Sequence, residues 1–180
     1  MRTAPTEQPS NQRTDRGAPA SAAGHPPLAT LDRVPWSQFR DSTGSAAAIP
    51  HLLRSVARGD APTARAALCE LRTRVCQYGF VVEQATAATV PFLWELAQLP
   101  HVACRAQIIK LLGDIADARQ WETTAAAYPK LLKHRDNHVT WERAARQAVR
   151  ERRGALRLLL AEGDSDVTHA TTRLARSLGA

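Results

Sequence analysis

The sequence predicts an all-α fold, a solenoid of about three stacked helix pairs. Three observations predict it. Alanine, leucine and arginine are abundant, and aromatic residues make up only 5% of the 180 residues, a composition that favours helices because these three residues lose little on entering one. Apolar residues recur at spacings of three and four. One residue pattern also returns after a period of about 40 positions, which is typical of helical repeats.

The first 27 residues have a different composition from the rest. Residues 1–27 are rich in Pro, Thr, Ser, Ala and Gly and show no apolar periodicity. Such a segment buries too little apolar surface to offset the entropy of ordering it. We therefore expect a disordered N-terminal tail over 1–27 and a helical domain over 28–180, entered through an extended stretch at Val34-Pro35-Trp36.

Two helix pairs are predicted at about 45–78 and 86–117. In the first pair Gly59 ends one helix and Asp60 can cap the next, with Pro62 in its first turn. The fourth helix is expected to open at Pro100. The apolar faces of the four helices are formed by Ile49, Leu52, Leu53 and Val56; by Ala64, Ala67, Leu68, Leu71 and Val75; by Val90, Leu93 and Leu96; and by Val102, Ile108, Leu111, Leu112 and Ile115.

The two pairs repeat each other in sequence. Ile49-Pro50 corresponds to Val90-Pro91 at an offset of 41, and Leu71 corresponds to Leu111 at an offset of 40. A helix pair of this size cannot bury its own apolar face, so neighbouring pairs must bury it for one another. Leu71 and Leu111 are accordingly expected to face one shared core.

The last third predicts one more helix pair after an insertion. The pair spans about 141–178, with a single long helix over 141–161, a break at Gly163-Asp164 and a final helix. The insertion covers about 118–140 and is expected to hold a short helix that Pro129 interrupts.

Several of these segments resemble a group of actinobacterial HEAT-repeat proteins of the armadillo type. The resemblance covers about 31–117 and, more weakly, 141–178. It rests on Leu31 to Trp36, Gly44-Ser45, Ile49-Pro50 and Val90 to Leu93. It implies a HEAT-like solenoid. Some HEAT-like proteins neutralise toxins, some scaffold complexes and one branch excises alkylated DNA bases, so the fold does not choose the function.

No motif in the sequence predicts catalysis or a cofactor. A Gly-rich phosphate loop, G-x-S-x-G and H-E-x-x-H are all missing from the 180 residues. His134 and His138 have the spacing of metal ligands on a helix, but Asp136-Asn137 between them signals a turn and no third ligand has a fixed spacing. We therefore expect a protein that is not an enzyme and binds neither a metal nor another cofactor.

A base-excising site is the remaining catalytic possibility. It would need a carboxylate and aromatic side chains around an extruded base, for which Asp114 with Trp94, Trp121 and Trp141 could be considered. Trp94 lies on an otherwise apolar helix, however, and core packing is the favoured interpretation.

Cysteine usage and hydropathy bear on location. Cys69, Cys76 and Cys104 are odd in number and form no CxxC, and no apolar leader follows Met1. This pattern is typical of reduced thiols in a cytoplasmic protein, and we expect all three to be buried. No stretch approaches the roughly 20 apolar residues of a membrane span, so no membrane partner is expected.

The strongest functional signal is a series of arginines. Residues 119–180 hold twelve of the basic and seven of the acidic residues of a chain whose net charge is +7. Five arginines spaced by three, four, three and four would fall within one arc of the predicted long helix, beside a separate apolar arc. They are Arg143, Arg146, Arg150, Arg153 and Arg157. We call them the arginine series.

The arginine series is the predicted binding surface. A partner protein with an acidic surface is the favoured ligand, and toxin neutralisation is one version that the resemblance implies. Nucleic-acid binding through phosphate contacts is the alternative. A solvated face, or ion pairs to a neighbouring unit, would explain the same residues without any partner.

Overall fold

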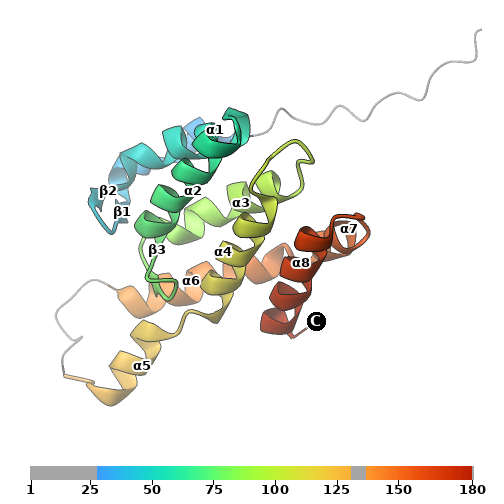
Figure 1. Ribbon diagram of the computed structural model, residues 1–180. Helices are drawn as coiled ribbons and strands as arrows, with labels where there is room; N and C mark the ends of the chain where they lie inside the picture. The colour runs from blue at the N-terminus through green and yellow to red at the C-terminus, as the bar shows by residue number, and fades with distance from the viewer. Residues whose placement is uncertain (1–27, 131–136, 180) are drawn as a thin grey trace, which may run out of the picture.

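The computed structural model describes residues 28–130 and 137–179, and this part of the chain is mostly helical, which confirms the all-α prediction (Figure 1). The α-helices are α1 Ile49–Arg58, α2 Ala61–Val75, α3 Thr86–Ala97, α4 Arg105–Asp117, α5 Gln120–Ala127, α6 His138–Glu151, α7 Leu156–Leu160 and α8 Ser165–Leu178. Short 3₁₀ turns lie at Leu31–Arg33, Trp36–Gln38, Ala46–Ala48 and Arg153–Ala155. Two antiparallel hairpins pair β1 Arg40–Asp41 with β2 Gly44–Ser45, and β3 Cys76–Gln77 with β4 Val81–Val82.

The helices pack in an order that runs across the molecule. The first pair, α1 with α2, and the second, α3 with α4, each pack as hairpins. Beyond them α3 lies against α6, and α4 packs most extensively against α8. In Figure 1 the helices α2, α4 and α8 follow one another from one side of the view to the other, and α5 projects at the lower edge.

Local sequence explains most of the helix ends in the first pair. Gly59 is the first residue after α1, and the Asp60 side chain accepts a 2.9 Å hydrogen bond from the backbone N–H of Thr63 at the start of α2. Two predicted boundaries are wrong. The chain leaves α2 at Cys76 rather than Gly79, because residues 76–82 pair as a hairpin, and α4 starts at Arg105 because residues 100–104 form turns.

The core is one continuous apolar cluster that extends from the entry segment to α8. Leu71 and Leu111, predicted to be equivalent, are 0% and 1% exposed. Trp94 is fully buried in α3, as predicted. Trp36 fixes the entry segment, since its indole N–H donates to the Leu31 carbonyl at 2.8 Å and its ring packs near that of Phe92.

A buried arginine joins the second helix pair to the last helix. Arg105, at the start of α4, is 7% exposed, and its Nε donates to the Ala97 carbonyl at 2.8 Å. Its guanidinium also forms an ion pair with Glu162, just before α8. A buried charge needs such partners, so Arg105 holds the end of α3 and the turn before α8 in one place.

The last third differs from its predicted form. The single long helix over 141–161 is wrong: α6 ends at Glu151, a 3₁₀ turn follows, and α7 begins at Leu156. Gly154 lies in that turn and is a poor helix former. The short helix predicted in the insertion is present as α5, which ends before Pro129. The expected tail over 1–27 lies outside the described residues, as do residues 131–136 of the insertion.

Candidate functional site

Two members of the arginine series form ion pairs with Glu122 of α5. The Arg143 Nε atom lies 2.7 Å from Glu122 Oε1, although the Arg143 side chain is 66% exposed. Arg146 is only 5% exposed, with Nη2 2.7 Å from Glu122 Oε2 and Nη1 donating to the Ala118 carbonyl at 3.3 Å. For these two residues the structure matches the alternative of ion pairs to a neighbouring unit, and Arg146 is not part of an open surface.

Two glutamates, Glu122 on α5 and Glu142 on α6, connect these two helices. Glu142 is completely buried, and its carboxylate accepts hydrogen bonds of 3.0 and 2.9 Å from the backbone N–H groups of Trp121 and Glu122 in the first turn of α5. The pKa of Glu122 lies below its ordinary value because Arg143 and Arg146 donate to its carboxylate. This network caps a helix and neutralises charge, which are structural roles.

The other three arginines stay exposed. Arg150 is in the last turn of α6, Arg153 is in the 3₁₀ turn and Arg157 is in α7. Among residues 28–130 and 137–179 none of them forms an ion pair. They do not lie along one helix axis, so the predicted geometry is wrong, while binding through these three residues remains a prediction.

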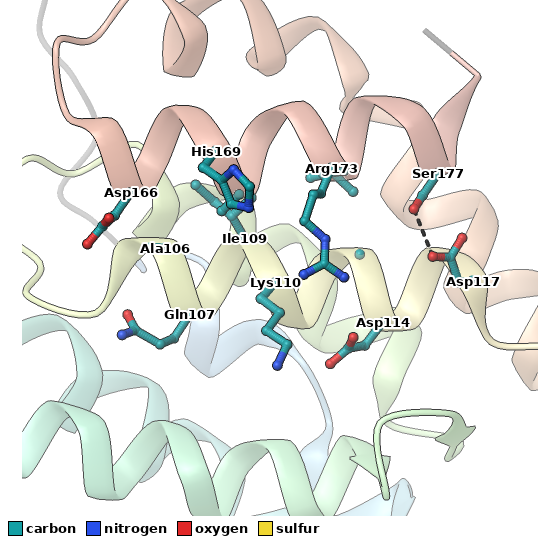
Figure 2. A pocket seen from close by; sticks show the side chains of 13 residues that line it. Ala106, Gln107, Ile109, Lys110, Asp114, Asp117, Asp166, His169, Arg173 and Ser177 are labelled. Atoms are coloured by element: carbon teal, nitrogen blue, oxygen red, sulfur yellow. Dashed lines mark hydrogen bonds between the residues drawn. The ribbon is translucent and has the colours of Figure 1, made fainter.

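A pocket of about 340 Å³ lies between α4 and α8 (Figure 2). Its lining residues come from both helices and carry charges of both signs. From α4 they are Ala106, Gln107, Ile109, Lys110, Gly113, Asp114 and Asp117, and from α8 Asp166, His169, Ala170, Arg173, Leu174 and Ser177.

Two of the three pocket carboxylates already have partners. Arg72 Nη2 on α2 lies 2.9 Å from Asp114 Oδ2, and the Ser177 hydroxyl donates to Asp117 Oδ2 at 2.7 Å. The pKa of Asp114 is raised because its burial outweighs the favourable charges of Arg72, Lys110 and Arg173. Neither Lys110 nor Arg173 forms an ion pair with another described residue.

A second hollow adjoins the pocket on its other side. It has a volume of about 250 Å³, lies between α2 and α4, and is lined by Arg65, Leu68, Cys69, Arg72, Gln107, Lys110 and Leu111. Gln107 and Lys110 line both hollows. In Figure 2 the Lys110 side chain extends from α4 away from α8. The two hollows form one surface, which we call the α2–α4–α8 groove.

The β3–β4 hairpin lies at one end of this groove. Its turn residues Tyr78 and Gly79 have positive φ angles of 56° and 81°. A Cβ atom at Gly79 would lie 2.9 Å from Arg72 Nη2 and 3.7 Å from Asp114 Oδ2, so the turn rests on that ion pair. The Tyr78 and Phe80 residues are 77% and 47% exposed, with ring centroids 6.1 Å apart.

The cysteines are only partly as predicted. Cys76 and Cys104 are buried, but Cys69 on α2 is exposed and lines the groove, which contradicts the prediction for that residue. Burial raises the pKa of the Cys76 thiol to about 12, and the nearby Asp114 charge acts in the same direction. Cys76 is therefore a neutral packing residue at ordinary pH.

Of the residues considered for catalysis or metal binding, the described ones are only partly brought together. His138 stacks on Trp121 at 4.2 Å between ring centroids and meets Trp141 edge-on at 4.5 Å, while His134 lies outside the described residues. Within the described part of the chain, no group of three or more His, Cys, Asp or Glu residues could hold a metal. Trp94 is buried, so its ring cannot stack on an extruded base.

The groove and the hairpin were missed by sequence reasoning. One usable signal was the run Gln77-Tyr78-Gly79-Phe80, because a glycine between two aromatics after an apolar helix suggests an exposed turn. The groove had a weaker signal, namely the polar positions of α2, α4 and α8 between their apolar residues.

Comparison with known proteins adds no further assignment. No protein-family model matches the chain, and searches of the curated proteins and of the solved structures give no match either. Over the described residues, no helix is long and apolar enough to cross a membrane.

Proposed function

We propose that the chain is a non-catalytic binding module for a partner protein, built as a HEAT-like solenoid in which α1, α3 and α6 stack as one layer and α2, α4 and α8 as the other. The contacts of α3 with α6 and of α4 with α8 support this stacking. The single observation that carries the function is the α2–α4–α8 groove, a hollowed surface formed by three helices and lined with charged side chains.

The charges in the groove favour a protein over a nucleic acid. Asp114, Asp117 and Asp166 are interleaved with Lys110 and Arg173 along the pocket. A phosphate backbone repeats one charge along its whole length and cannot match a lining in which carboxylates alternate with cations, whereas a protein surface can place opposite charges against both signs. The pocket is also lined by alanine and leucine side chains, which supply the apolar contact that protein interfaces have at their centre.

Nucleic-acid binding is the second candidate, and a different surface favours it. Arg150, Arg153 and Arg157 are exposed and, with the neighbouring Arg152, concentrate positive charge around the end of α6. Three phosphate contacts to duplex DNA would give a log–log salt slope of roughly −3. A shallower slope, or none, would leave the groove as the functional surface.

Photo-crosslinking in cells of the natural host tests the proposed function. A benzophenone amino acid at the exposed Gln107 places the probe where both hollows meet, and the same residue at the exposed His51 on α1 serves as the control. We expect one discrete crosslinked protein from position 107 and not from position 51. Equal labelling from both positions, or crosslinks to nucleic acid alone, would contradict a protein-binding groove.

A toxin-neutralising role in the cytoplasm is the narrower version of this proposal. It rests on the sequence resemblance and on the three free thiols. Co-expression decides it: a toxin-like protein encoded beside this chain should stop growth alone and lose that effect when this chain is present.

A further inference from the structure

Exposed aromatic side chains stand on a fixed turn at the end of the groove. The core buries three other large aromatic side chains, Trp36, Phe92 and Trp94. An apolar interior is therefore present, and Tyr78 and Phe80 are nevertheless exposed. Tyr78 also adopts left-handed backbone geometry, which costs a non-glycine residue roughly 1–2 kcal/mol. Strain of this kind is found at binding sites, and exposed aromatics are frequent anchors of protein interfaces.

The cations next to this turn are available to a ligand. Asp114 is held by Arg72, and Asp117 accepts from Ser177. Lys110 and Arg173, from α4 and α8, therefore line the pocket without an ion-pair partner among the described residues. The remaining carboxylate, Asp166, lies at the opposite end of the pocket from Asp114 (Figure 2). The hairpin end of the groove holds three cations, Arg72, Lys110 and Arg173, against the two carboxylates of Asp114 and Asp117, so it carries an excess of one positive charge.

We propose that this end of the groove binds an acidic segment of the partner protein that carries one apolar residue, an inference that rests on the proposed function. The apolar residue packs on Tyr78 and Phe80, and the carboxylates pair with Lys110 and Arg173. The spacing is suitable: the hairpin turn lies beside Asp114, and Lys110 precedes Asp114 by four residues, roughly 6 Å along the helix axis. A carboxylate roughly two or three extended residues from the apolar anchor reaches it.

Fluorescence anisotropy with a synthetic probe tests the proposal on the full chain. The probe is a fluorescein-labelled peptide of sequence WGEEEE, and the matched probe is WGKKKK. We expect saturable binding of the acidic probe only. The double variant Lys110→Glu with Arg173→Glu should weaken that binding by about tenfold or more, because attraction becomes repulsion.

Matched variants separate the groove from general charge effects. Arg33→Glu with Arg58→Glu makes the same change of net charge at two exposed arginines outside the groove and the arginine series and should leave the affinity within about twofold. Tyr78→Ala with Phe80→Ala should weaken binding by about fivefold or more without changing its salt dependence. Tyr128→Ala removes a ring just after α5 whose exposure lies between those of Tyr78 and Phe80, and it should not weaken binding. Circular dichroism verifies that each variant is folded.

Two results would overturn the inference: no saturable binding of WGEEEE, or equal weakening by the control variant Arg33→Glu with Arg58→Glu. Either result leaves the proposed function open to its own test, because crosslinking at Gln107 reports any protein in the groove and not an acidic one. A crosslinked partner together with an unbound acidic probe means that the groove recognises a different chemistry.

Discussion

Tyr78 and Leu28 are the two non-glycine residues with positive φ in the described ranges. Their surroundings differ. Leu28 is 9% exposed and its backbone N–H donates to Glu95 at 3.2 Å, so burial and a hydrogen bond offset its conformational cost. Tyr78 is 77% exposed and has no such compensation from burial. At the residue scale, Tyr78 is therefore the position where stability and the proposed binding are opposed.

Replacing Tyr78 by glycine should stabilise the protein while weakening binding. Glycine adopts positive φ without steric cost, so we expect Tyr78→Gly to raise the free energy of unfolding by about 1 kcal/mol, or the melting temperature by about 2–4 °C. Differential scanning calorimetry measures this. Tyr128→Gly is the control, because Tyr128 has a φ of −133° and is also exposed, and it should not gain stability. A destabilised Tyr78→Gly protein would show that the ring supports the fold.

At the scale of elements, α5 is unusual because none of its residues is buried. Its position depends on the half-buried Trp121, which packs against the core, and on polar contacts. Glu142 caps its first turn, and the Trp121 indole N–H donates to the Val82 carbonyl of β4 at 3.0 Å. A helix of eight residues has little stability of its own, so these contacts determine whether it forms.

Removal of the cap should therefore release α5 before the rest of the protein. In Glu142→Ala two backbone N–H groups lose their acceptor, at a cost of roughly 1–3 kcal/mol. We expect faster amide exchange over residues 120–127 and nearly unchanged protection in α4, as measured by hydrogen exchange with mass spectrometry. Glu151→Ala removes an exposed carboxylate from the same helix and should change neither. Uniformly faster exchange in Glu142→Ala would contradict a local role.

Sequence patterns predicted some elements well and others poorly for a physical reason. The helices α2 and α4 have apolar faces whose period follows from local geometry, so Leu71 and Leu111 could be assigned to the core. Arg146 and Glu142 also follow a helical period, but their burial depends on α5. This helix supplies Glu122 as the ion-pair partner of Arg146 and the backbone N–H of Trp121 as a donor to Glu142. Periodicity places a residue on a face and does not identify the neighbour of that face.

The candidate site was harder to predict than the fold for a related reason. The groove joins Lys110 to Arg173 across a sequence separation that contains α5, α6 and α7. The sequence shows both residues as ordinary exposed cations, since nothing local distinguishes them from Arg150. The hairpin is similar, because the contact of Gly79 with Arg72 and Asp114 is a tertiary one.

At the scale of the whole molecule, a single core takes buried residues from α1 to α4 and from α6 to α8, and its loss should be global. Leu71→Asp and Leu111→Asp each place a carboxylate in a site that is at most 1% exposed. The cost should be several kcal/mol, roughly the whole stability of a domain. We expect both variants to lose the cooperative thermal transition, which circular dichroism at 222 nm measures.

The surface leucine of α7 supplies the control for this change. Leu158 is 64% exposed, so Leu158→Asp should melt within about 2 °C of the wild type. If Leu111→Asp melted like Leu158→Asp, the assignment of one continuous core to α4 and its neighbours would be wrong.

The ion pair between Arg105 and Glu162 has a consequence for anyone who shortens the chain. A version that stops after α6 would keep Arg105 inside but lose Glu162, and it would also uncover the side of α4 that α8 covers. Such a fragment would contain a guanidinium without its ion-pair partner and an apolar surface of α4 newly exposed to solvent. This combination promotes self-association. Useful fragments of this protein should therefore retain the full length of α8 through Leu178.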